Sequence, residues 1–151
     1  MGVVISILET DRFRIFTLEK PHVSRTDGGH IIIDPKVVVE DRTKLSSTDA
    51  KEMMKLTMVA GEAMKNALSS RGIEIGRINY QDNGNWTHEL HIHLYGRAKG
   101  AVIQKYGTPL KFPPTGKEQQ LLTLEPLNEG DISAIQKEIR RLMDTDKYKN
   151  F

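Results

Sequence analysis

The sequence contains no cysteine, which excludes disulfide bonds and thiolate metal sites and fits a reducing compartment. It also lacks any apolar run near the roughly 20 residues of a membrane-spanning helix. The short apolar stretch at residues 2–8 has no basic leader and continues into charged residues, unlike a secretory signal. We therefore expect a cytoplasmic protein with no membrane partner.

An excess of charge of one sign is also missing. The 22 lysines and arginines nearly balance the 20 aspartates and glutamates, for a net charge of +2. With no long basic block, the charge pattern argues against a nucleic-acid partner and is compatible with a small anionic ligand. A chain of 151 residues with 38% apolar residues suits one ordinary core, so we predict a single domain over residues 1–151.

Hydrophobic periodicity predicts the elements of that domain. Strand-like patterns occupy residues 3–8, 13–18, 30–33, 73–81 and 86–95, the last two joined by a hairpin turn at Asn83-Gly84. Three consecutive isoleucines in the third strand predict burial on both of its faces. A helix is expected over residues 48–70, capped by Ser46 and ended by Gly72. The prediction is an α+β fold with a central antiparallel sheet of about five strands.

The C-terminal third is predicted to be mostly irregular. Glycine and proline recur between about residues 97 and 128, which favours either a loop that folds over a ligand or a surface insertion. A C-terminal helix is expected over about residues 131–146, with Asp131 as its cap and one apolar stripe.

The most informative stretch is Trp86 to Arg97, which holds three of the five histidines. If it is a strand, alternate residues share a face, so Glu89, His91 and His93 lie together with Tyr95. Three uses of that face remain open. A neutral imidazole can attack phosphorus, Glu89, His91 and His93 can bind a metal such as zinc, or the histidines can be structural.

The preceding segment, Gly84 to Thr87, favours phosphoryl chemistry. Consecutive backbone amides after a turn, with Asn85 and Thr87 as further donors, can surround phosphate oxygens and stabilise charge that develops on them. An ordinary Asn-Gly turn explains Gly84 equally well.

These residues resemble the signature of the histidine triad (HIT) family over about residues 8–100. The family pattern is His-x-His-x-His and two apolar residues, preceded by a Gly-Gln-Ser/Thr-Val loop, and the chain matches it without a gap over residues 84–95. The segment Gly29 to Lys36 also resembles the family's Gly-His-hydrophobic-Pro-Lys strand. Because Val38 is not a histidine, the chain is more similar to the fragile-histidine-triad branch, whose members cleave dinucleoside polyphosphates.

The resemblance implies a role for each matching residue. His91 would attack the α-phosphorus to form a nucleotidyl-histidine that water hydrolyses, and His93 would support it. His30 matches an additional site histidine and Asn79 an asparagine that faces the nucleotide. Phosphate contacts would come from Gly84, Asn85, Trp86 and Thr87.

The main departure is Glu89, which stands where the family has its first histidine. A carboxylate beside a phosphate is repelled by it unless the carboxylate is protonated or paired with an imidazolium. We predict that Glu89 acts with His91 and His93 as a catalytic residue. The alternatives are a metal-binding protein that uses these three residues and a non-catalytic nucleotide-binding module. The resemblance further implies a homodimer with a continuous sheet and no obligatory cofactor, although a divalent cation can accompany a polyphosphate substrate.

Overall fold

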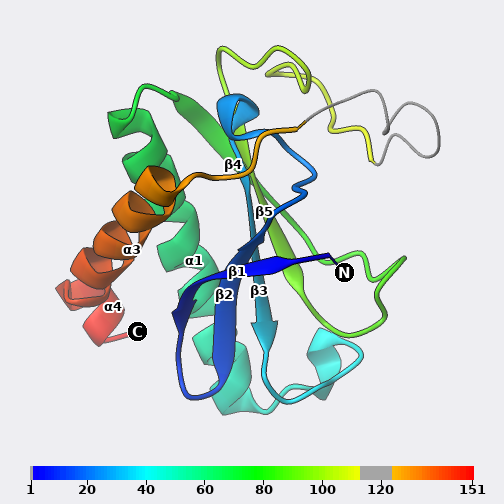
Figure 1. The fold of residues 1–151 in the computed structure, drawn as a ribbon. Coiled ribbons are helices and arrows are strands. Elements are labelled where there is room, and N and C mark those ends of the chain that lie inside the picture. Colours follow the sequence, from blue (N-terminus) through cyan, green and yellow to red (C-terminus); the bar gives the residue numbers. More distant parts are fainter. Residues whose placement is uncertain (1, 113–123) are drawn as a thin grey trace.

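A computed structural model describes residues 2–112 and 124–151 of the chain. Its centre is a five-stranded antiparallel sheet in the order β1-β2-β3-β5-β4 (Figure 1). The strands are β1 (Val4–Glu9), β2 (Phe13–Leu18), β3 (His30–Pro35), β4 (Ile75–Gln81) and β5 (Ile92–Ala98). The helices are α1 (Ser47–Ser70), α3 (Glu129–Met143) and α4 (Asp146–Lys149), with the short 3-10 helices η1 (Arg25–Asp27) and η2 (Arg42–Lys44). The predicted α+β fold is confirmed.

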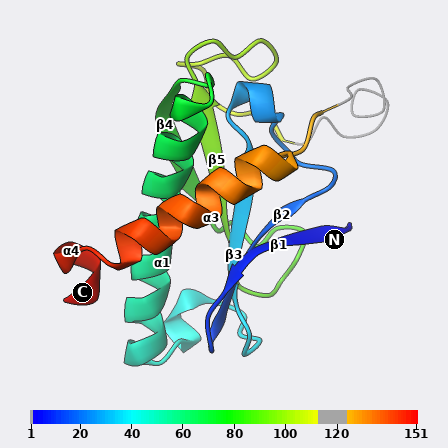
Figure 2. The same cartoon turned by 60° about the vertical axis from the view of Figure 1, so that its left-hand side comes forward.

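The sheet has one helical face and one open face. Helices α1 and α3 lie on the same side of the sheet, and α3 crosses α1 obliquely (Figures 1 and 2). Strand β3 is buried on both faces, as its isoleucines predict: Ile31 and Ile33 join the helical core, while Ile32 packs with Phe16 and Leu18 on the opposite face. No helix in the described ranges combines the length and apolar character needed to cross a membrane.

The predicted start and end of α1 are confirmed. The Ser46 side chain accepts from the Asp49 amide at 3.1 Å. At the other end Gly72 has φ +90°, and the amide of Ile73 donates to the carbonyl of Leu68 at 2.9 Å, a closure that satisfies the last carbonyls. The methionines that face the sheet from this helix are core residues.

The C-terminal helix begins earlier than predicted. Asn128 is its cap, and Asp131 lies in the first turn, where the two residues exchange side-chain-to-backbone hydrogen bonds of 2.9 and 3.0 Å. Asp131 is also fully buried and paired with Arg25 and Arg71. The prediction that Asp131 is the cap is therefore wrong: the cap is Asn128, and the Asp131 side chain completes the capping box by accepting from the Asn128 amide.

The predicted tight hairpin between the last two strands is wrong. Strands β4 and β5 do pair antiparallel, with Gln81 opposite His93, but β5 begins only at Ile92. Residues 82–91 form a long connection, and the strand is central to the sheet as expected. An Asn-Gly pair signals a turn, but strand pairing depends on tertiary contacts that the local pattern does not contain.

Candidate active site

A cavity of about 560 Å³ lies on the open face of the sheet. It is bounded by strands β2 to β5, by the connection between β4 and β5, and by loop residues 20–22 and 110–112. Its lining includes Leu18, Lys20, His22, Ile32, Gly84, Asn85, Trp86, Thr87, His91, His93, Tyr95, Leu110 and Phe112. The structure thus brings His91, His93 and the predicted phosphate-binding segment to one cavity.

The protonation pattern of His91 follows from one hydrogen bond. Its Nδ1 lies 2.6 Å from the backbone carbonyl oxygen of Glu89. A carbonyl oxygen can only accept, so Nδ1 carries the proton and, in the neutral ring, Nε2 carries the lone pair. His91 is buried just before β5 and lines the cavity, so the unprotonated nitrogen is the one left for chemistry.

A chain of hydrogen bonds orders the remaining histidines. The backbone amide of His22 donates to Nδ1 of His30 at 3.2 Å, so the proton of the neutral His30 ring resides on Nε2. That Nε2–H then donates to Nδ1 of His93 across 2.8 Å. His93 in turn must carry its proton on Nε2, which leaves it a hydrogen-bond donor next to His91, whose ring centroid is 4.7 Å away.

Burial keeps these imidazoles neutral. Burial, together with the nearby His91 and His22, lowers the pKa of His93 to about 3. Burial likewise holds the pKa of the fully buried His30 well below its ordinary value, with His22, His93 and His91 adding to the effect. The pKa of His22 is lowered for the same main reason. A neutral ring with a fixed tautomer gives each nitrogen one role at neutral pH.

The charges around the cavity suit an anion. No carboxylate occurs among the described residues that line it, and Lys20 contributes a cation. Gly84 takes φ +65°, a conformation that glycine adopts at no steric cost, and this turns the segment 84–87 along the cavity wall. Its residues and the Nε2–H of His93 provide the kind of donors that phosphate oxygens require.

Glu89 is not on the face predicted for it. It lies in the connection before β5, where the alternation of a strand does not apply, and its side chain is exposed. It lines two smaller surface hollows and is absent from the lining of the histidine cavity. Its backbone carbonyl oxygen contacts His91, and its side chain borders two hollows that His91 also lines. The carboxylate therefore lies beside His91 at the surface and does not line the histidine cavity itself.

The other predicted residues divide between the cavity and its support. His30 lies beneath His93 and does not line the cavity. Asn79 pairs with Tyr95 in the sheet register and so shares the open face, but it does not line the cavity, and its side-chain oxygen accepts a 2.9 Å hydrogen bond from Arg97. His88 is exposed and paired with Glu40, in agreement with its expected absence from the functional face.

His22 is one of the cavity residues that the sequence patterns do not indicate. It lies in the loop after β2, and its Nδ1 is 2.9 Å from the hydroxyl of Tyr95, whose pKa is raised by burial. The centroid of its ring lies 4.5 Å from that of His30 and 5.3 Å from that of His93. No periodicity marks a single loop histidine, so the only available signal was its residue type.

The proposed metal ligands Glu89, His91 and His93 are not gathered together. In the described part of the chain, the group with suitable spacing is His22, His30 and His93, whose candidate nitrogens lie within 4.8 Å of one another. However, a metal-bound imidazole needs an unprotonated ligand nitrogen, and the His22 amide places the His30 proton on the nitrogen that faces His93. The observed arrangement is better suited to hydrogen bonding than to coordination.

Comparison with known proteins agrees with this architecture. A family model for the HIT domain matches residues 5–100. Among curated proteins, none matches the chain in sequence.

Several solved structures share the fold. A histidine triad protein from Bradyrhizobium japonicum has a TM-score of 0.63 at 15% identity, with 90% of each chain covered. One from Sinorhizobium meliloti has a TM-score of 0.64 at 18% identity, covering 91% of this chain and 88% of that one. A zinc-bound histidine triad family protein from Mycobacterium smegmatis has a TM-score of 0.62 at 16% identity, covering 93% and 87%. At these identities the likeness concerns the fold alone.

Proposed function

The chain belongs to the HIT domain family, and from that premise we propose that it hydrolyses or transfers the nucleotidyl group of a nucleotide conjugate. The family generally includes nucleotide-binding hydrolases and transferases. The attack is proposed at the α-phosphorus, and dinucleoside polyphosphates are the proposed substrates. The observation that carries the proposal is the hydrogen bond from His91 Nδ1 to the carbonyl of Glu89, which in the neutral ring places the lone pair on Nε2, in a cavity with no carboxylate among its described lining residues.

In the first step, Nε2 of His91 forms a bond to the α-phosphorus. The bond from phosphorus to the leaving group breaks, and its electron pair departs with that group, which for a polyphosphate leaves as an anion. The imidazole, now bonded through both nitrogens, carries positive charge, and the Glu89 carbonyl stabilises it by accepting from Nδ1–H. His93 Nε2–H donates to a phosphate oxygen as negative charge develops there.

In the second step, water attacks the same phosphorus and the bond to Nε2 breaks. The electron pair returns to His91, a proton of the water passes to solvent, and the nucleotide monophosphate is released. If another acceptor replaces water, the same step is a transfer. Neither step calls for a cofactor, although a divalent cation can neutralise a polyphosphate leaving group.

Intact-mass measurement during turnover tests this proposal. The purified protein is incubated with a panel of adenylylated and guanylylated conjugates, and the nucleotidyl adduct is mapped by peptide. Adduct formation on His91 is expected, with release of the nucleotide. Thermal stabilisation by nucleoside monophosphates without any turnover would identify a binding module instead. Stoichiometric metal in the purified protein, lost on substitution of His22 or His93, would favour a metal site.

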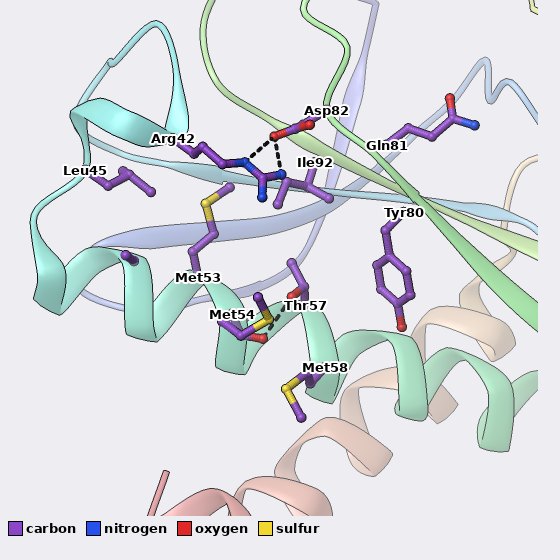
Figure 3. A pocket seen from close by; sticks show the side chains of 11 residues that line it. Arg42, Leu45, Met53, Met54, Thr57, Met58, Tyr80, Gln81, Asp82 and Ile92 are labelled. Atoms are coloured by element: carbon purple, nitrogen blue, oxygen red, sulfur yellow. Dashed lines mark hydrogen bonds and ion pairs between the residues drawn. The ribbon is translucent and has the colours of Figure 1, made fainter.

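We also propose that two copies associate through the outer edge of β4, which pairs with no other strand among the described residues. Strand β4 ends the sheet, and beside it a pocket of about 520 Å³ opens between β4 and α1 (Figure 3). Apolar side chains line much of it, among them Met53, Met54, Met58 and Tyr80. Met54 and Tyr80 are each more than half exposed, so a second copy would cover apolar surface while its β4 extends the sheet.

Light scattering coupled to gel filtration tests the association. The wild type is expected to be a dimer, and Tyr80→Lys combined with Met54→Lys is expected to be a folded monomer. Val102→Lys is a control for added charge, because Val102 is exposed but does not line the pocket beside β4. A monomeric wild type would contradict the proposed assembly without affecting the assignment of His91.

A further inference from the structure

The loop after β5 is held by a buried carboxylate. Asp27, at the end of η1, is 1% exposed, and its two oxygens accept the backbone amides of Val102, Ile103 and Gln104 at 2.8, 3.0 and 2.7 Å. Three charge-assisted hydrogen bonds from consecutive amides fix the direction of the chain at this point. The loop is therefore built into the fold at its start.

A buried guanidinium holds the same loop further along. Arg97 of β5 donates to the carbonyl oxygens of Lys105 and Thr108 at 3.0 and 2.6 Å, and also to Asn79. η1 can approach β5 this closely because residues 28 and 96 are glycines: a Cβ on Gly28 would lie 2.0 Å from the carbonyl oxygen of Gly96. Neither Asp27 nor Arg97 lines the histidine cavity.

The anchored loop ends at the cavity wall with Phe112. Its ring stacks on that of Tyr95, with centroids 4.7 Å apart and an interplanar angle of 29°. Tyr95 in turn stacks on His93 at 5.3 Å and 8°. A row of rings thus leads from the proposed phosphate-binding histidine to Phe112, which is partly exposed and lines the cavity.

The surroundings of Phe112 favour a flat, uncharged ligand group. Leu18, Ile32 and Leu110 contribute apolar surface to the same cavity, and no carboxylate occurs among its described lining residues. A polar aliphatic group placed against these walls would lose its hydration without compensation. A heteroaromatic ring would instead gain stacking contact, which is tolerant of sequence and of ring type.

We propose that Phe112 determines substrate specificity by stacking on the base of the substrate's nucleotidyl group, and that Asp27 is a positioning residue that holds Phe112 in place. This inference rests on the proposed function, since it assigns the non-phosphate part of the same substrate. It selects phosphate conjugates that carry an aromatic base over those that carry only a sugar.

The experiment compares adenosine 5′-phosphoramidate with ribose 5-phosphoramidate, which share phosphorus and leaving group and differ in the base. Phe112→Ala and Phe112→Leu are expected to raise the KM for the adenosine compound about tenfold with little change in kcat, in keeping with base–aromatic stacking. The KM for the ribose compound should not change. Phe112→Tyr should restore the wild-type KM, and Ile103→Ala, an exposed side chain of the same loop, is the matched control.

A double-mutant cycle tests the positioning role of Asp27. Asp27→Asn offers one acceptor oxygen in place of two, so it should loosen the loop and raise the KM for the adenosine compound. Combined with Phe112→Ala, it should add little further, because both act through the same ring. Additive effects, or an equal rise for the ribose compound, would show that Asp27 serves stability alone.

Two outcomes separate this inference from the proposed function. If the wild type turns over both compounds equally and Phe112→Ala changes neither KM, the specificity role is wrong and the nucleotidyl transfer stands. If the wild type turns over neither of these compounds nor a dinucleoside polyphosphate, the proposed function fails. Stacking is then still measurable as the thermal shift with adenosine monophosphate relative to ribose 5-phosphate. An equal shift in wild type and Phe112→Ala overturns the role of Phe112.

Discussion

The backbone carbonyl of Glu89 lies 2.6 Å from Nδ1 of His91, while the Glu89 side chain points to solvent outside the cavity. Glu89 thereby orients the ring of His91 through its backbone carbonyl, and this contact does not depend on the Glu89 side chain. The position where the family pattern has a histidine is thus occupied here by a residue whose side chain is exposed and does not line the histidine cavity.

Replacement of the Glu89 side chain should leave catalysis nearly intact. Glu89→Gln and Glu89→Ala keep the carbonyl that accepts from His91, so kcat/KM is expected to stay within about twofold of the wild type, an effect typical of surface positions. Steady-state kinetics with an adenylylated conjugate measures it. A loss of a hundredfold or more would place the carboxylate in the reaction and contradict the geometry.

Replacement of His91 should abolish turnover. His91→Asn removes the attacking nitrogen, and loss of a nucleophile lowers kcat by at least about 1,000-fold in enzymes where it has been removed. The covalent adduct should disappear from the intact-mass spectrum at the same time. His88→Gln is the matched control, because His88 is exposed and paired with Glu40 away from the cavity. Equal losses in both variants would remove His91 from the role of nucleophile.

Stability should fall as the pH decreases below about 6.5, the ordinary histidine pKa. The pKa of folded His93 is lowered to about 3, so between these values the unfolded chain binds a proton that the folded chain does not. The neutral His93 ring therefore contributes fully to the free energy of unfolding above the unfolded pKa. As the pH falls below that value, the free energy of unfolding decreases by at most about 1.4 kcal/mol per pH unit for each such histidine.

Thermal unfolding at pH 7.5, 6.5, 5.5 and 5.0 measures how stability depends on pH. These pH values lie above the range in which most carboxylates take up protons. His93→Asn keeps a side-chain acceptor for His30 but has no titrating ring, so its melting temperature should depend less on pH. An identical pH dependence in the variant and the wild type would argue against a neutral, buried His93.

Loss of the Asp131 carboxylate should destabilise the fold strongly. The fully buried side chain pairs with Arg25 at 2.7 Å and Arg71 at 2.8 Å, and it completes the cap of α3. Removing the carboxylate leaves both guanidiniums without it, and because their side chains are 19% and 36% exposed, the cost should lie below the roughly 3–5 kcal/mol of a fully buried pair. Urea unfolding of Asp131→Asn measures it. Asp144→Asn, which breaks an exposed pair with Lys149, should change stability by less than about 1 kcal/mol. Similar effects for both would contradict the ion-pair argument.

Local patterns predicted most of the framework. The isoleucines of β3, the Ser46 cap and the Gly72 end of α1 are encoded by residues close to each other in the chain, and all are confirmed. The start of β5 was misplaced because residues 86–91 alternate like a strand without pairing as one. That error carried Glu89 onto a face it does not occupy.

The sequence by itself determined the fold class, the sheet and its helices, and the pairing of His91 with a preceding amide-rich segment. These depend on periodicities of 2 and 3.6 and on turn residues, which act within a few positions. Only the tertiary structure decided the tautomers of His30 and His93, the position of His22 in the cavity and the attachment of residues 102–104 to Asp27. Those depend on atoms brought together from residues 8 to 77 positions apart, and no local pattern records such contacts.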